Sequence, residues 1–180
     1  KALYMLTYKR KLKLSKVQED RISSWIGSCR LVYNMGMQIK KEAWKNKQVN
    51  VSTYDLINQL PDIKDYDWIA DVPSQSLQNS LERLDRSYKN FFKSFKSGGG
   101  FPKFKSKRTY NSILFKQGNL KQSHPSIELT SKQTIKLPKI GELSFFKDKS
   151  LIIGKIKTAT IVKEPTGFFI CIVCDEVSKN

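Results

Sequence analysis

Few side chains in this sequence have the types and spacing that chemistry requires. Four of the 16 acidic residues lie close together, namely Asp62, Asp65, Asp67 and Asp71. Clustered carboxylates can hold the two divalent metal ions of a nuclease. Metal-binding carboxylates usually come from separate, rigid elements, however, whereas these four share one short segment between predicted helices. We therefore interpret this segment as a solvated loop with helix-capping acids.

The cysteines and the only histidine also favour no reactive site. Cys171 and Cys174 form a C-x-x-C pair within a strand-like segment, where residues three apart point to opposite faces. Cysteines of a buried strand are therefore favoured over a zinc half-site. His124 stands beside Pro125 in a predicted turn without a partner for nucleophilic chemistry, so we interpret it as a surface residue. The odd, sparse cysteine set favours a reducing cytoplasm.

The charge of the chain points to binding instead of catalysis. Its 180 residues carry a formal net charge of +17 and a pI near 9.8, an excess too large for an ordinary solvated surface. Nucleic acid is the expected polyanionic partner, and an anionic membrane is the alternative. Because no apolar run reaches the roughly 18 residues that a bilayer span needs, we expect no membrane partner.

Basic and aromatic residues alternate in the middle of the chain, and no acid occurs between Asp85 and Glu128. The predicted phosphate-binding set is Arg83, Arg86, Lys89, Lys93, Lys96, Lys103, Lys105, Lys107 and Arg108. Phe101 and Phe104 interleave with these lysines, where they could stack on bases or anchor the segment to the core. The two interpretations are compatible.

A second set of residues could read base edges. Tyr54, Ser74, Gln75 and Gln78 carry the amides and hydroxyls that such contacts use, and Gln can bind adenine through two hydrogen bonds. A glutamine on a helix is more often simply solvated, so both interpretations stay open.

A long amphipathic helix must position most of these residues. It is expected to begin at Asp71 or Ser74, and Gly98–Gly100 are expected to end it. Its predicted buried face recurs at steps of three and four and consists of Leu77, Leu81, Leu84, Tyr88, Phe91, Phe92 and Phe95. Two further helices are predicted upstream, one capped by Ser15 with Gln18 and one capped by Ser52 with Asp55.

Short strand-like runs separated by turns make up the rest. They are 3–14, 112–117, 126–129, 134–137, 142–146, 155–163 and 168–174. The pattern predicts an α+β fold in which a small, OB-type β-barrel carries an inserted helical bundle. The predicted parts are residues 1–14 as the first strand, 15–98 as the helical module and 99–180 as the remainder of the barrel.

Several motifs together resemble TnpB, the OrfB-type protein of insertion sequences. They are CRLVYNMGMQIKKEAW, VPSQSLQNSLERLDRSYKNFF, GFPKFKSKR, IKLPKIGELSF and GKIKTATI, in this order. TnpB proteins are RNA-guided DNA endonucleases related to type V CRISPR effectors. The resemblance covers the N-terminal region of such a protein and implies a wedge-like barrel interrupted by a helical recognition module. It also implies guide RNA and double-stranded DNA as partners, in the cytoplasm at the nucleoid.

The resemblance further implies which residues and cofactors to expect. Tyr54 and Gln78 match motif-reading positions, a lysine expected near Ser74 is replaced, and Lys116 and Gln117 fall near another reading position. In the family a RuvC-like nuclease domain, with three acidic metal ligands and a zinc-binding insert, follows this region. We therefore expect no catalytic residue, Mg or Zn within these 180 residues. The alternative function is a truncated or nuclease-dead relative that represses by RNA-guided DNA binding.

Overall fold

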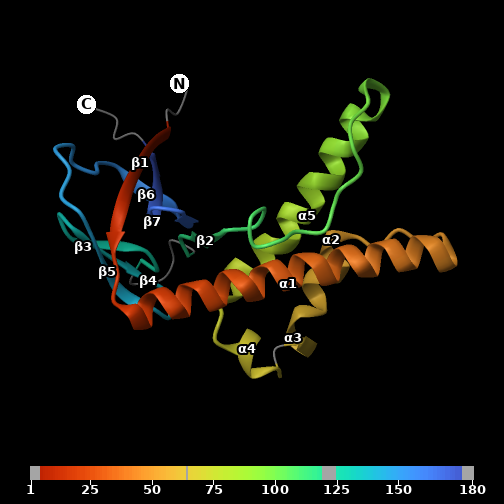
Figure 1. The fold of residues 1–180 in the computed structure, drawn as a ribbon, viewed down its shortest axis with the longest axis horizontal. Coiled ribbons are helices and arrows are strands. Elements are labelled where there is room, and N and C mark those ends of the chain that lie inside the picture. The colour runs from red at the N-terminus through yellow and green to blue at the C-terminus, as the bar shows by residue number, and fades with distance from the viewer. Residues whose placement is uncertain (1–4, 64, 119–124, 176–180) are drawn as a thin grey trace. The chain divides into compact units, whose positions relative to one another are not determined.

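The chain falls into two compact units in a computed structural model that describes residues 5–63, 65–118 and 125–175 (Figure 1). The sheet unit comprises Lys1–Ser23 and Asn111–Asn180, and the helical unit comprises Ser24–Tyr110. The sequence predicted the boundaries of the helical module after residues 14 and 98. The first turns of the long N-terminal helix cluster with the strands because Gln18 donates to the Glu142 carbonyl (3.3 Å) and Lys163 donates to the Ser23 hydroxyl (3.2 Å). Leu3, Tyr4 and His124 lie outside the described residues.

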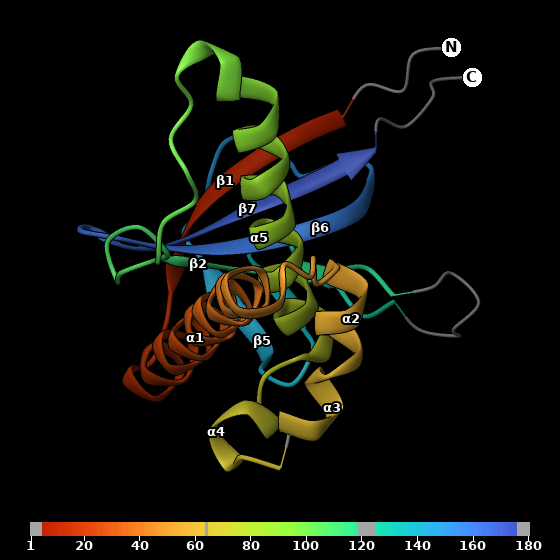
Figure 2. The same ribbon diagram turned by 90° about the vertical axis from the view of Figure 1, so that its right-hand side faces the viewer.

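Seven antiparallel strands form the sheet unit, which confirms the α+β class and all seven predicted strands. They are β1 (Met5–Lys13), β2 (Ser112–Lys116), β3 (Glu128–Ser131), β4 (Thr134–Leu137), β5 (Gly141–Phe145), β6 (Lys155–Glu164) and β7 (Gly167–Asp175). Their order is β2-β6-β7-β1-β5-β4-β3. Figure 2 shows β1, β7 and β6 side by side. Their register pairs Leu6 with Cys174 and Ile161 with Ile170.

The sheet does not close into the predicted barrel. Within the described residues β2 pairs only with β6 and β3 only with β4, so β2 and β3 are the two edges. A side chain occupies the place where closure would need a strand ladder. The Gln117 amide donates to the Ile127 carbonyl (2.8 Å) and accepts from the Ile127 N–H (2.9 Å), which satisfies that backbone without strand pairing.

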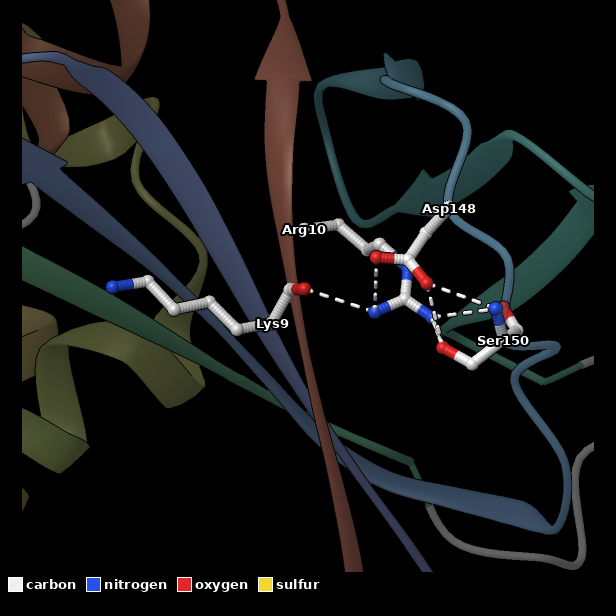
Figure 3. A network of polar contacts seen from close by, with 4 residues as sticks. All are labelled: Lys9, Arg10, Asp148 and Ser150. Carbon is white, nitrogen blue, oxygen red and sulfur yellow. Dashed lines mark hydrogen bonds and ion pairs between the residues drawn. The ribbon is translucent and has the colours of Figure 1, made fainter.

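Strand β1 has one basic face and one buried face, because its basic and buried side chains alternate. Lys9, Lys11 and Lys13 are exposed, whereas Leu12 and Arg10 are buried. Arg10 is only 7% exposed, and a buried guanidinium needs partners. It donates to the Lys9 carbonyl (2.9 Å) and to both the carbonyl (3.0 Å) and hydroxyl (2.8 Å) of Ser150 (Figure 3). These bonds tie the segment between β5 and β6 to β1.

The helical unit is built on two long helices. Its elements are α1 (Lys16–Lys47, whose first turns belong to the sheet unit), α2 (Thr53–Asn58), α3 (Leu60–Ile63), α4 (Asp67–Ala70), α5 (Ser74–Ser94) and the 3-10 turn η1 (Phe95–Ser97). Both predicted capping boxes are confirmed, since Ser15 bonds reciprocally with Gln18 and Ser52 with Asp55. None of the described helices combines the length and apolar character that crossing a bilayer requires.

A glycine sets how closely the long helices approach each other. A Cβ atom at Gly36 of α1 would lie 2.8 Å from a methyl carbon of Leu81 and 3.1 Å from one of Leu84, both on α5. Leu56 of α2 meets the same spot at 3.4 Å. The missing side chain therefore lets two helices, α2 and α5, bury leucines against one point of α1.

Candidate nucleic-acid interface

Helix α5 is buried along only part of its length. In residues 74–84, here called the sealed half, the side chains of Ser76, Leu77, Ser80, Leu81 and Leu84 are buried. In residues 85–94, the uncovered half, none of the side chains is fully buried. Phe92 there is 69% exposed, and Phe95 just beyond it is 66% exposed. The prediction that the apolar stripe is buried as far as Phe95 is therefore wrong at its C-terminal end.

The aromatic rings at this end of α5 pack mainly on one another. Phe91 lies 5.3 Å from Phe92, 5.4 Å from Phe95 and 5.2 Å from Phe101, measured between ring centroids. Tyr88 meets Phe101 edge-on at 5.6 Å. These contacts hold the rings while leaving much of Phe92, Phe95 and Phe101 exposed.

The segment that follows η1 begins at Gly98 and is anchored to α1. Gly98 adopts a φ of 84°, the left-handed conformation that ends a helix, as predicted. Asn34 of α1 then holds the backbone of Lys105 at two points, donating to its carbonyl (2.9 Å) and accepting from its N–H (2.8 Å). This clamp fixes Lys103, Lys107 and their neighbours in place while their side chains stay exposed.

Phe101 and Phe104 do serve as anchors, and both keep exposed ring surface. The ammonium of Lys41 lies 4.6 Å from the Phe104 centroid and 5.6 Å from the Phe101 centroid, within the range of a cation–π contact. Each ring remains nearly half exposed. The geometry therefore keeps both sequence interpretations of these phenylalanines compatible.

The predicted phosphate-binding cations fall into two groups. Arg83, Lys89 and Lys105 each contact another side chain of the helical unit. Arg83 donates to Asn79 (2.9 Å) and lies over the Tyr110 ring, Lys89 pairs with Asp85 (2.7 Å), and Lys105 lies over the Tyr33 ring. The second group is exposed, and within the described residues no ion pair is recorded for it. It consists of Arg86, Lys93, Lys96, Lys103, Lys107 and Arg108.

Burial and charge act together around Asp85. Burial raises the pKa of its carboxyl, but the hydrogen bonds and positive charges around it, including those of Lys89 and Lys40, together outweigh burial and hold the pKa below its usual value. The nearby Lys40 ammonium is partly buried, and that burial lowers its pKa. Lys40 donates to the Val51 carbonyl and lies 5.4 Å from the Tyr88 ring centroid. Asp85 is therefore a carboxylate held among cations at neutral pH.

The predicted base-reading residues are divided between the two units. Tyr54 is exposed on α2, Ser74 and Gln75 are exposed in the first turn of α5, and Gln78 is half-buried one turn later. All four belong to the helical unit, where α2 packs beside α5 (Figure 2).

Lys116 and Gln117 belong to the sheet unit instead. Lys116 is half-buried in β2, and the amide of Gln117 is bonded to Ile127 as described above. A contact of Gln117 with a base would therefore need to replace those two hydrogen bonds.

The other residues considered for catalysis or metal binding have structural roles or lie in helix first turns. Asp71 accepts a hydrogen bond from the Trp25 indole (2.7 Å), and Asp62 and Asp67 lie in the first turns of α3 and α4. Cys174 is buried and Cys171 half-buried on opposite faces of β7, as predicted. Among residues 5–63, 65–118 and 125–175, no group of three His, Cys, Asp or Glu residues is placed to hold a metal ion.

Sequence reasoning missed the residues that α1 contributes to this surface. The sequence pattern gave no functional role to Asn34, Lys40, Lys41 or Trp44. One signal was available in the sequence, because Trp44 is a large aromatic residue among lysines at the end of this helix; the structure leaves it 62% exposed.

Comparisons with known proteins identify relatives of this chain. Residues 5–48 match the model of a helix-turn-helix domain of the OrfB/IS605 type. InsQ of Escherichia coli (strain K12), whose name describes an RNA-guided DNA endonuclease, is 27% identical over 92% of this chain. A protein of Streptomyces pristinaespiralis with the same description is 23% identical over 88% of it. The chain spans 39% of the length of each relative.

The matched segment has a simpler form than its description. Residues 5–48, all of which the structure describes, contain β1 and the single uninterrupted helix α1. This segment therefore does not contain the two helices and intervening turn of a helix-turn-helix.

Proposed function

The chain is related to the TnpB proteins of insertion sequences, and from that premise we propose that it holds a guide RNA and reads a short motif in duplex DNA. The names of the two relatives describe RNA-guided DNA endonucleases, which implies both kinds of nucleic acid as partners. For this chain we propose the binding steps alone.

One observation carries the proposal: exposed cations gather on a segment without acids. Arg86, Lys93, Lys103, Lys107 and Arg108 are exposed in the helical unit, and no acid occurs between Asp85 and Glu128. A surface of one sign attracts phosphates and releases their counterions. We place the RNA backbone here and on the basic face of β1, with Phe101 and Phe104 available to stack on bases.

We place the DNA motif on α2 and the first turns of α5. Tyr54, Ser74, Gln75 and Gln78 supply hydroxyls and amides there, and Lys116 and Gln117 of the sheet unit are proposed as further contacts. If Gln78 reads a base, Gln78→Ala should weaken binding to the preferred duplex by about 1–3 kcal/mol and relax the preference at one base pair. Selection of bound duplexes from a random pool, with each variant, measures this; equal loss on all sequences would exclude readout by Gln78.

The phosphate contacts are tested by the salt dependence of affinity. The double variant Lys103→Ala/Arg108→Ala should lower the slope of log affinity against log salt by about 1.4 for single-stranded RNA, because two contacts are lost. Lys16→Ala is the matched control, since Lys16 is exposed but pairs with Asp20 (2.9 Å) outside this surface. An unchanged slope in the double variant would contradict the assignment. EDTA at constant ionic strength should not weaken binding, because we assign no metal to this part.

A further inference from the structure

A pocket of about 580 Å³ opens in the helical unit, beside the uncovered half of α5. The last turns of α1 contribute Lys41 and Trp44, α5 contributes Asp85, Tyr88 and Phe92, and the segment after Gly98 contributes Phe101. This volume lies in the range of pockets that hold small organic groups. What this pocket binds is inferred on the basis of the proposed function.

The walls include large aromatic side chains that keep much of their surface exposed. Trp44 and Phe92 are 62% and 69% exposed, and Phe101 is held edge-on by Tyr88. Exposing three large rings to water at one place is unfavourable unless a partner covers them. A flat, aromatic partner fits such walls, because aromatic side chains stack on every kind of nucleobase.

The charges in and around the pocket determine which part of a nucleotide can enter. Asp85 lines the pocket as a carboxylate, and a carboxylate repels a phosphate group. Lysines line the same pocket: Lys89 pairs with Asp85, and Lys41 lies over the rings of Phe101 and Phe104. This arrangement favours a base against the rings, whose N–H groups can donate to Asp85, and the phosphate of the same nucleotide at the lysines.

We propose that this pocket holds one unpaired nucleobase of single-stranded RNA, stacked between Phe92 and the rings of Trp44 and Phe101. RNA is the source because the DNA of the proposed function is a duplex, whose bases are already paired and stacked. Single-stranded loops and ends of RNA, in contrast, present unstacked bases to aromatic side chains. The pocket would thus fix one nucleotide of the RNA whose backbone lies on the neighbouring cations.

The test compares two exposed phenylalanines in the full chain. Phe92 lines the pocket, whereas Phe95 is equally exposed and does not. The probe is a short fluorescein-labelled oligoadenylate RNA at physiological salt, read by anisotropy. Phe92→Ala should weaken binding roughly five- to 100-fold through the loss of stacking on one base, and Phe95→Ala less than about two-fold. The salt slope should not change in either variant, since no phosphate contact is removed.

Tryptophan fluorescence gives a second reading of the same event. Stacking of a base on Trp44 should quench its emission when the oligoadenylate is added, and Trp44→Phe should abolish that quenching while keeping a ring at the site. Trp25, which is buried, and Trp68 on α4 remain in both proteins as internal references. Circular dichroism checks that each variant keeps the helical content of the parent.

Each result has a defined meaning. If Phe92→Ala and Phe95→Ala behave alike, or if Phe92→Ala weakens a fully paired RNA hairpin as strongly as oligoadenylate, the pocket assignment is overturned and the proposed function still stands. Tighter binding of oligodeoxyadenylate than of oligoadenylate would overturn the choice of RNA. If the parent protein binds neither RNA nor duplex DNA, the proposed function itself fails.

Discussion

The two halves of α5 follow the same apolar repeat and have opposite surroundings. In the sealed half, leucines alternate with small serines and meet α1 where Gly36 has no side chain. In the uncovered half the same positions carry Tyr88, Phe91 and Phe92, which are too large for such a close approach and keep exposed surface. Residue size thus decides which half packs as core and which half presents rings and cations to a partner.

The largest expected difference is in stability. Leu84→Ala, in the sealed half, should lower the free energy of unfolding by about 2–5 kcal/mol, because it leaves a cavity at a side chain that is fully buried. Phe92→Ala, in the uncovered half, removes more atoms and should change the free energy of unfolding by less than about 0.5 kcal/mol. Urea unfolding measures both. Comparable losses for the two variants would contradict the division of α5.

The pH dependence of stability should also show that water is excluded from the contact between α1 and the sealed half. Burial raises the pKa of the Cys29 thiol, which lies next to Ser76 of α5, to about 11. The folded state keeps this proton while the unfolded chain loses it near pH 9, so stability is full below pH 9 and falls between pH 9 and 11. The loss should be about 2 kcal/mol.

Cys29→Ala is the control for that pH effect. Both proteins keep Tyr110, whose pKa burial raises to about 12, and Cys174, so the difference between the two stability curves isolates Cys29. Parallel curves from pH 8 to pH 10.5 would mean that water reaches the thiol.

A pair of glycine substitutions tests the close approach of α1 and α5. Gly36→Ala should destabilise the protein by about 1 kcal/mol, since its Cβ would force the buried Leu81 and Leu84 to move. Gly27→Ala in the same helix meets only the tip of Arg30 at 3.6 Å, and should stabilise by about 0.5–1 kcal/mol through helix propensity. Thermal unfolding of both variants should therefore shift in opposite directions, and a common direction would exclude the proposed role of Gly36.

The smallest effect on stability is expected for the exposed cations. Lys93→Ala in the uncovered half should leave the free energy of unfolding within about 0.5 kcal/mol of the parent value. It should still lower the salt slope of binding to single-stranded RNA by about 0.7, because one phosphate contact is lost. If instead the slope stays constant while the unfolding free energy falls, Lys93 has a structural role.

Local patterns in the sequence predicted the elements well. All seven strands, the two capping boxes and the glycine that ends the α5 region follow from alternation, residue spacing and side-chain capability over a few residues. The basic face of β1 follows from the same alternation.

Features that depend on distant parts of the chain could not be predicted in this way. The hydrogen bonds between the Gln117 amide and Ile127, and the 69% exposure of Phe92, both depend on how the fold arranges segments outside the local pattern. The pocket needs residues from α1, α5 and the segment after Gly98, which only the fold brings together. The apolar period showed which residues share a face and gave no information about what covers that face.

The most direct test of this division is to map where RNA lies on the full chain. Ultraviolet crosslinking of bound single-stranded RNA, followed by mass spectrometry of the peptides, should place crosslinks within residues 86–108 and at Trp44, and none in the sealed half. Crosslinks confined to the sealed half, or absent from 86–108 although RNA is bound, would contradict the account.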